Sequence, residues 1–349
     1  MEIVKELSEI SWQVPEKVYR EDPALSYSTL STYESVGYNG LEHLFDKKES
    51  TSLTEGSMVD CLITSSVKEF EEQFYVADFP SVGDKEKLVA DYLFINYGGQ
   101  YSTMEDIPAT YILEAANSYE FQKNWKDETR IKVLTERCSV YYTLKVQAGT
   151  RIVVPLETME RIQAMVRALR ESPATCGYFA DDDEMSPIRR YYQLKFKFSH
   201  DGVNYRSMAD LIVVDYDKKI VYPIDLKTSS MPEWDFEKSF CKWHYYIQSR
   251  LYWRNIRANM DADDYFKDFI LDDYRFIVVN KKTLTPLVWK FPLTKVEGTL
   301  LDEYDNEIRD PFEIGKELQG YLDCKPPVPN GINKDGINII NCLKVKEDA

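Results

Sequence analysis

The chain of 349 residues is 44% hydrophobic and 29% charged, a composition typical of a folded globular protein with a sizeable core. It contains no run of about 18 apolar residues and no basic-then-apolar leader, so we expect no membrane span and a cytoplasmic location. A net charge of −16 argues against a partner held mainly through phosphate contacts. Local basic faces, or divalent ions placed between acidic side chains and phosphate, would still permit such a partner.

The predicted elements fall into a helical first part and a later part rich in strands. Residues 50–66 and 156–172 have the apolar spacing and start signals of helices. Alternating side chains and turn residues then predict five strands, with one long helix between the third and the fourth, and a last helix near the end. In chain order these elements cover residues 189–199, 204–216, 220–228, 240–259 (the long helix), 274–280, 286–291 and 311–322 (the last helix).

This order predicts an α/β (α+β) fold with a mixed central β-sheet flanked by helices, because short polar connections favour antiparallel neighbours. We expect one domain over residues 1–325. It would consist of a helical part at 1–185, the sheet and its helix at 186–292, and a C-terminal helical part at 293–325. Residues 326–349 are predicted to form a tail. Six cysteines without a C-x-x-C pair argue against a zinc ribbon and an iron–sulfur cluster.

The stretch "VYPIDLKTSS" places two opposite charges at the end of an apolar strand. Strand alternation puts Asp225 and Lys227 on the same face, while the opposite face is wholly apolar and suited to packing against helices. The Asp-x-Lys spacing also occurs at three other places in the chain, and a surface ion pair is its ordinary explanation. The pair therefore needs support from neighbouring elements before it indicates a site.

Two neighbouring elements supply that support. Asp210 interrupts the apolar segment "SMADLIVVD", where a carboxylate is costly without a partner, and a hairpin would bring it beside Asp225. On the long helix, Gln248 and Tyr252 are four residues apart and share a face, in the one Gln-x-x-x-Tyr spacing of the sequence. Without the aspartates, packing within the core would explain this helix pair.

Two carboxylates beside a lysine make chemical sense as a site for a hard cation. Mg²⁺ or Mn²⁺ takes oxygen ligands and keeps several waters. A lysine beside a metal-bound water can orient that water or favour its deprotonation, and the cation stabilises negative charge at a phosphorus centre. The pattern therefore favours phosphodiester hydrolysis.

The segments "MADLIVVDYDKKIVYPIDLKT" and "YYIQSRLYW" together resemble the core of the PD-(D/E)xK nuclease superfamily, in particular its exonuclease VIII (RecE-like) and RecB-type branch. The resemblance implies that Asp210, Asp225 and the backbone carbonyl of Leu226 bind Mg²⁺, with Mn²⁺ as a substitute. It implies that Lys227 serves the attacking water. The four-cysteine iron–sulfur cluster of some RecB-type relatives is not expected, because its cysteine spacing is missing.

The same resemblance assigns further residues. Gln248 and Tyr252 would hold the active-site strand and the DNA backbone. The branch has an upstream helix with Gly-x-x-x-His, whose histidine contributes to the metal site. Here "EGSMVDC" gives Gly56 with Asp60 at the histidine position. Asp60 could supply an oxygen ligand or mark a lost one. The stretches at 24–45 and 156–179 also resemble the branch, so the resemblance touches most of residues 24–292.

Basic side chains on the long helix are candidate DNA contacts. Arg250 and Arg254 recur at helical spacing and could follow a phosphate backbone, although a solvated helix face explains them equally well. The resemblance implies a phage-type exonuclease that resects duplex DNA ends in recombination and repair, in the bacterial host cytoplasm. It also implies a ring-shaped homo-oligomer and a single-strand annealing protein as partner. A related DNA endonuclease, and a non-catalytic DNA-binding or assembly protein of the same fold, are the alternatives.

Overall fold

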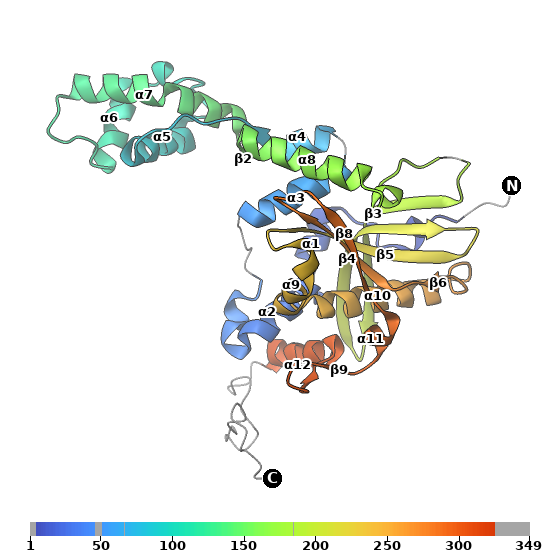
Figure 1. Ribbon diagram of the computed structural model, residues 1–349. Coiled ribbons are helices and arrows are strands. Elements are labelled where there is room, and N and C mark those ends of the chain that lie inside the picture. The colour runs from blue at the N-terminus through green and yellow to red at the C-terminus, as the bar shows by residue number, and fades with distance from the viewer. Residues whose placement is uncertain (1–4, 46–50, 66, 184, 325–349) are drawn as a thin grey trace, which may run out of the picture. The chain divides into compact units, whose positions relative to one another are not determined.

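The computed structural model describes residues 5–45, 51–65, 67–183 and 185–324 (Figure 1). The chain divides into two compact units. One combines Met1–Asp60 with Met165–Ala349, and the other is Cys61–Ala164. The expectation of one domain over residues 1–325 stays a prediction, and the predicted tail at 326–349 lies outside the described residues.

The first unit is built on a six-stranded mixed sheet, which confirms the predicted fold class. Strands β3, β4 and β5 form an antiparallel meander, β7 runs parallel to β5, β8 is antiparallel to β7, and the short β6 extends the pairing of β5. A parallel neighbour requires a crossover, and the helices between β5 and β7 supply it. The strands are Ile188–His200 (β3), Val203–Asp215 (β4), Ile220–Ser229 (β5), Ile270–Leu271 (β6), Tyr274–Asn280 (β7) and Pro286–Phe291 (β8).

The crossover helix α10, Tyr245–Asp261, packs against β3 and β4 (Figure 1). It buries Ile247, Leu251 and Ile256 in the main core. The sequence predicted one helix over 240–259. That prediction is wrong in its first turns, because His244 adopts the left-handed conformation (φ 54°) and separates α10 from the shorter α9, Phe236–Lys242. Packing of apolar side chains between α10 and the sheet fixes the strands from one side.

Shorter elements complete this unit and cover the sheet. Helix α2 (Tyr27–Val36) and helix α12 (Pro311–Cys324) pack against each other and against α10. The remaining elements of the unit are η1 (Leu7–Ile10), α1 (Glu16–Glu21), η2 (Tyr38–His43), η4 (Cys176–Tyr178), η5 (Glu233–Asp235), α11 (Leu293–Glu297), β9 (Leu300–Leu301) and β10 (Glu307–Ile308).

The second unit is mainly helical and has its own core, formed by buried side chains such as Leu93, Ile112 and Tyr142. Its elements are α4 (Val67–Gln73), β1 (Phe74–Val76), α5 (Asp84–Tyr97), η3 (Met104–Asp106), α6 (Ala109–Ser118), α7 (Asp127–Ala148) and β2 (Ile152–Val154), with β1 parallel to β2. Two helices have residues in both units, α3 (Thr51–Thr64) and α8 (Leu156–Glu171). No helix in the described part of the chain is long and apolar enough to cross a membrane.

Candidate active site

Asp210 and Asp225 meet where the pairing of β4 and β5 ends. The ladder between these strands stops at Leu211 and Ile224, so the next position on each strand carries an aspartate. Beyond the ladder, Oδ2 of Asp210 accepts a hydrogen bond from the backbone N–H of Leu226 at 2.9 Å, in place of a backbone carbonyl. Asp225 is 1% exposed, and its strand continues in register with β7 behind it. The predicted hairpin therefore does bring the two carboxylates together.

Lys227 lies on the same strand face as Asp225, as the alternation predicted. Its Nζ is 2.6 Å from Asp225 Oδ2, which is close enough for an ion pair, although the contact falls outside hydrogen-bond geometry. The ammonium group also lies 4.7 Å from the centre of the Tyr245 ring. Burial lowers the pKa of Lys227, but the charges of Asp225 and Asp210 outweigh that effect and raise the pKa above its ordinary value. Lys227 is therefore a permanent cation at neutral pH.

Gln248 holds the aspartate strand from the crossover helix. Its Nε2 donates to Asp225 Oδ1 at 2.5 Å, and the side chain is 4% exposed. Tyr252, one turn further along α10, is buried against Tyr274 of β7, with ring centres 6.5 Å apart. Gln248 thus makes a polar contact with the site, and Tyr252 makes a packing contact with the core. Both contacts hold α10 against β5 and β7.

Asp60 approaches the same cluster from helix α3. Its Oδ2 accepts a hydrogen bond from Gln193 Nε2 at 2.7 Å, while Oδ1 is buried without a hydrogen-bond partner. Burial and the charge of Asp225 raise the pKa of Asp60 to about 7. Helix α3 lies close to the end of β5 at Gly56, where an added Cβ would be 3.6 Å from Thr228 Oγ1.

The cluster concentrates negative charge that Lys227 offsets only in part. Burial and the charge of Asp225 raise the pKa of Asp210 well above its usual value, with a further contribution from Asp60. Three carboxylates near one lysine leave an excess of negative charge whenever all are ionised. Such an excess is stable only with added positive charge or bound protons.

The donor set suits a hard divalent cation. Asp60 Oδ1, Asp225 Oδ2 and Gln248 Oε1 are buried oxygens without a hydrogen-bond partner. Among the described residues, no three His, Cys, Asp or Glu side chains form a cage that could hold a metal ion. Mg²⁺ commonly binds through one or two carboxylates, waters and substrate phosphates, and does not require such a cage. Asp225 and Asp60 therefore offer oxygens that suit the cation that the sequence implies, and ligation by Asp210 and the Leu226 carbonyl stays a prediction.

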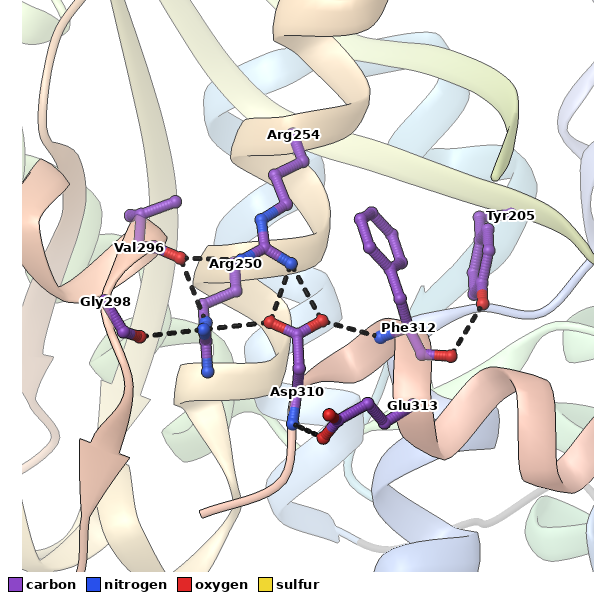
Figure 2. A network of polar contacts seen from close by, with 8 residues as sticks. All are labelled: Tyr205, Arg250, Arg254, Val296, Gly298, Asp310, Phe312 and Glu313. Atoms are coloured by element: carbon purple, nitrogen blue, oxygen red, sulfur yellow. Dashed lines mark hydrogen bonds and ion pairs between the residues drawn. The ribbon is translucent and has the colours of Figure 1, made fainter. Parts of the chain in front are cut away.

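Arg250 and Arg254 make their polar contacts with Asp310 and with nearby backbone carbonyls. Figure 2 shows both guanidinium groups converging on Asp310, with nitrogen–oxygen distances of 2.8 Å for Arg250 and 2.7 Å for Arg254. Arg250, 3% exposed, also donates to the carbonyls of Val296 and Gly298, and Arg254 donates to Val296. These contacts tie α10 to the segment before α12. Both guanidinium groups are thus engaged within the chain, and their predicted contact with DNA stays a prediction.

Sequence reasoning did not identify two further residues at the cluster. Gln193 lies opposite Asp210 on β3, and its place on the polar face of a predicted strand was the available signal. Tyr245, the first residue of α10, presents its ring to the Lys227 ammonium. Nothing in the sequence around Tyr245 indicated that its ring contacts Lys227.

Comparisons with known proteins give little further information about this chain. No family model matches it, and no curated protein sequence matches it. Among solved structures, one similar chain is the crystal structure of a "Putative exonuclease" from Eubacterium rectale, with a TM-score of 0.40 and 11% identity over 82% of this chain and 80% of that chain.

Proposed function

We propose that this chain is a Mg²⁺-dependent deoxyribonuclease that hydrolyses phosphodiester bonds at duplex DNA ends. The observation that carries the proposal is the contact set of Asp210, Asp225 and Lys227 at the end of the β4–β5 ladder, fixed by Gln248. Paired carboxylates beside a permanent cation form the oxygen-rich, partly neutralised environment that phosphoryl chemistry requires.

Asp210, Asp225 and the Leu226 carbonyl would hold Mg²⁺, with Mn²⁺ as a substitute, and Asp60 Oδ1 is available as a further ligand. When bound, the cation supplies Lewis acidity and lowers the pKa of coordinated water. In the reaction, a water oxygen forms a bond to phosphorus and its proton passes to bulk water. The phosphorus–oxygen bond to the leaving nucleotide breaks, and the leaving oxygen takes up a proton from solvent. The charges of Asp225 and Asp210 raise the pKa of Lys227 and favour its protonated form. In that form Lys227 would orient the water and stabilise negative charge on the phosphate.

The finer parts of the proposal rest on the resemblance to exonuclease VIII. They are end resection in phage-type recombination, a ring-shaped homo-oligomer around DNA, and a single-strand annealing protein as partner. The net charge of −16 and the engagement of Arg250 and Arg254 by Asp310 support binding by enclosure over binding by a basic face.

The proposal is tested by digestion of linear and covalently closed duplex DNA with Mg²⁺. We expect the wild type to degrade linear DNA and leave closed circles intact, and Asp225→Ala and Lys227→Ala to lose activity. Lys219→Ala is the matched control, because Asp217 and Lys219 repeat the Asp-x-Lys spacing on an exposed turn. Cleavage of closed circles would indicate an endonuclease. No digestion by the wild type, with Mg²⁺ or Mn²⁺, would leave a non-catalytic DNA-binding or assembly role.

A further inference from the structure

Gln193 has a backbone conformation that its strand does not require. Its φ is 55°, and among the described residues it is the one non-glycine with positive φ inside a β-strand. Within the pairing of β3 with β4, Tyr192 pairs with Leu211 and Leu194 pairs with Ala209. Gln193 and Asp210, which lie between these two pairs, are not paired with each other. Left-handed geometry is unfavourable for a residue with a Cβ, so such a residue persists only where its surroundings hold it there.

The side chain of Gln193 reaches the carboxylate cluster. Its Nε2 donates to Asp60 Oδ2 at 2.7 Å and so links strand β3 to helix α3. The other oxygen, Asp60 Oδ1, stays buried with no hydrogen-bond partner. One carboxylate oxygen is thus fixed by the chain, and the other is left with its lone pairs unused in a site that also contains Asp225 and Lys227.

An amide is well suited to this task. The –NH₂ group donates hydrogen bonds and has no lone pair with which to bind a cation. It is also uncharged, so it fixes the Asp60 carboxylate without neutralising it, whereas lysine or arginine would form an ion pair and reduce its affinity for a metal. Hydrogen bonds to the outer side of a metal-ligating carboxylate set its orientation.

We propose that Gln193 is a positioning residue that fixes Asp60 through Oδ2 so that Oδ1 serves as a cation ligand. The strained conformation within β3 is retained for this contact. The inference rests on the proposed function, since it assigns Asp60 to the cation of the same site. It adds β3 as a fifth element to the strands β4 and β5 and the helices α3 and α10, which already carry the cluster.

The test measures Mn²⁺ binding by titration calorimetry, without DNA, for the wild type, Gln193→Gly and Gln193→Ala. Glycine accepts the positive φ freely, so Gln193→Gly should keep or raise the melting temperature of the metal-free protein. Its Mn²⁺ affinity should nevertheless fall about 10-fold or more, the usual effect of losing such a supporting contact. Lys219→Gly, which removes a residue at φ 54° from the exposed turn before β5, is the matched control and should bind Mn²⁺ like the wild type.

A second comparison separates positioning from a structural role. In an Asp60→Asn background, Gln193→Gly should cause no further loss of Mn²⁺ affinity, because the contact that it removes no longer serves a ligand. Equal Mn²⁺ affinity of wild type and both Gln193 variants would overturn the inference and leave the nuclease proposal standing. A further loss in the Asp60→Asn background would also overturn it. A wild type that neither binds Mn²⁺ nor digests DNA would overturn both.

Discussion

The crowded carboxylates should make the metal-free protein less stable as the pH rises, and Asp60→Asn isolates one contribution. The pKa of Asp60 is raised from 3.8 to about 7 in the folded protein by burial and the charge of Asp225. A folded-state pKa above the unfolded one gives stability that is present below about pH 4 and is lost as the pH rises through about 7. At roughly 1.4 kcal/mol per pH unit, this interval corresponds to about 4 kcal/mol as an upper limit.

Asparagine stays neutral, so Asp60→Asn should be close to the wild type at pH 4 and more stable by a few kcal/mol at pH 8. Urea unfolding followed by tryptophan fluorescence in the presence of EDTA, repeated across this pH range, measures the difference. Added Mg²⁺ should reduce the advantage of the variant, because a ligated cation favours the ionised carboxylate of the wild type. A stability difference that does not change with pH, or a variant that is less stable at pH 8, would refute the reasoning.

The remaining predictions concern packing near the site and away from it. Gly315→Ala places a Cβ in steric overlap with the buried Tyr205 ring and its hydroxyl, and should cost about 1–3 kcal/mol in unfolding free energy. Gly56→Ala meets only an ordinary contact at 3.6 Å and should leave the melting temperature nearly unchanged. Arg250→Ala leaves Asp310 paired with Arg254 but removes a donor from the carbonyls of Val296 and Gly298, and should cost about 1–3 kcal/mol, while digestion per folded molecule stays near wild type. A loss of digestion by a fully folded Arg250→Ala would return this arginine to the DNA contacts.

Strand alternation predicted the geometry of Asp225 and Lys227 because a side-chain period of two depends on the backbone alone. The meeting of Asp210 with Asp225 was predictable for a related reason, since a short polar turn leaves an antiparallel hairpin as the simplest connection. The boundaries of β3, β4 and β5 agree with the predicted strands to within about one residue at most ends. Local periodicity thus suffices for the central sheet and its two facing aspartates.

Other features depend on contacts that no local pattern reveals. The helical spacing of Arg250 and Arg254 is the same whether they face DNA or Asp310, a residue 56 positions beyond Arg254. The left-handed conformations of His244 and Gln193 divide a helix and distort a strand, and neither residue type signals it. Long-range partners and local backbone strain are decided by tertiary structure, so they appear only in the folded chain.

Anomalous diffraction from crystals soaked in Mn²⁺ tests most directly whether the carboxylate cluster is a catalytic cation site. The account predicts a manganese peak beside Asp210, Asp225 and the Leu226 carbonyl, and the loss of that peak in Asp225→Ala crystals. A wild-type protein that digests linear duplex DNA with Mn²⁺ but places manganese elsewhere, or nowhere, at saturating concentration would contradict it.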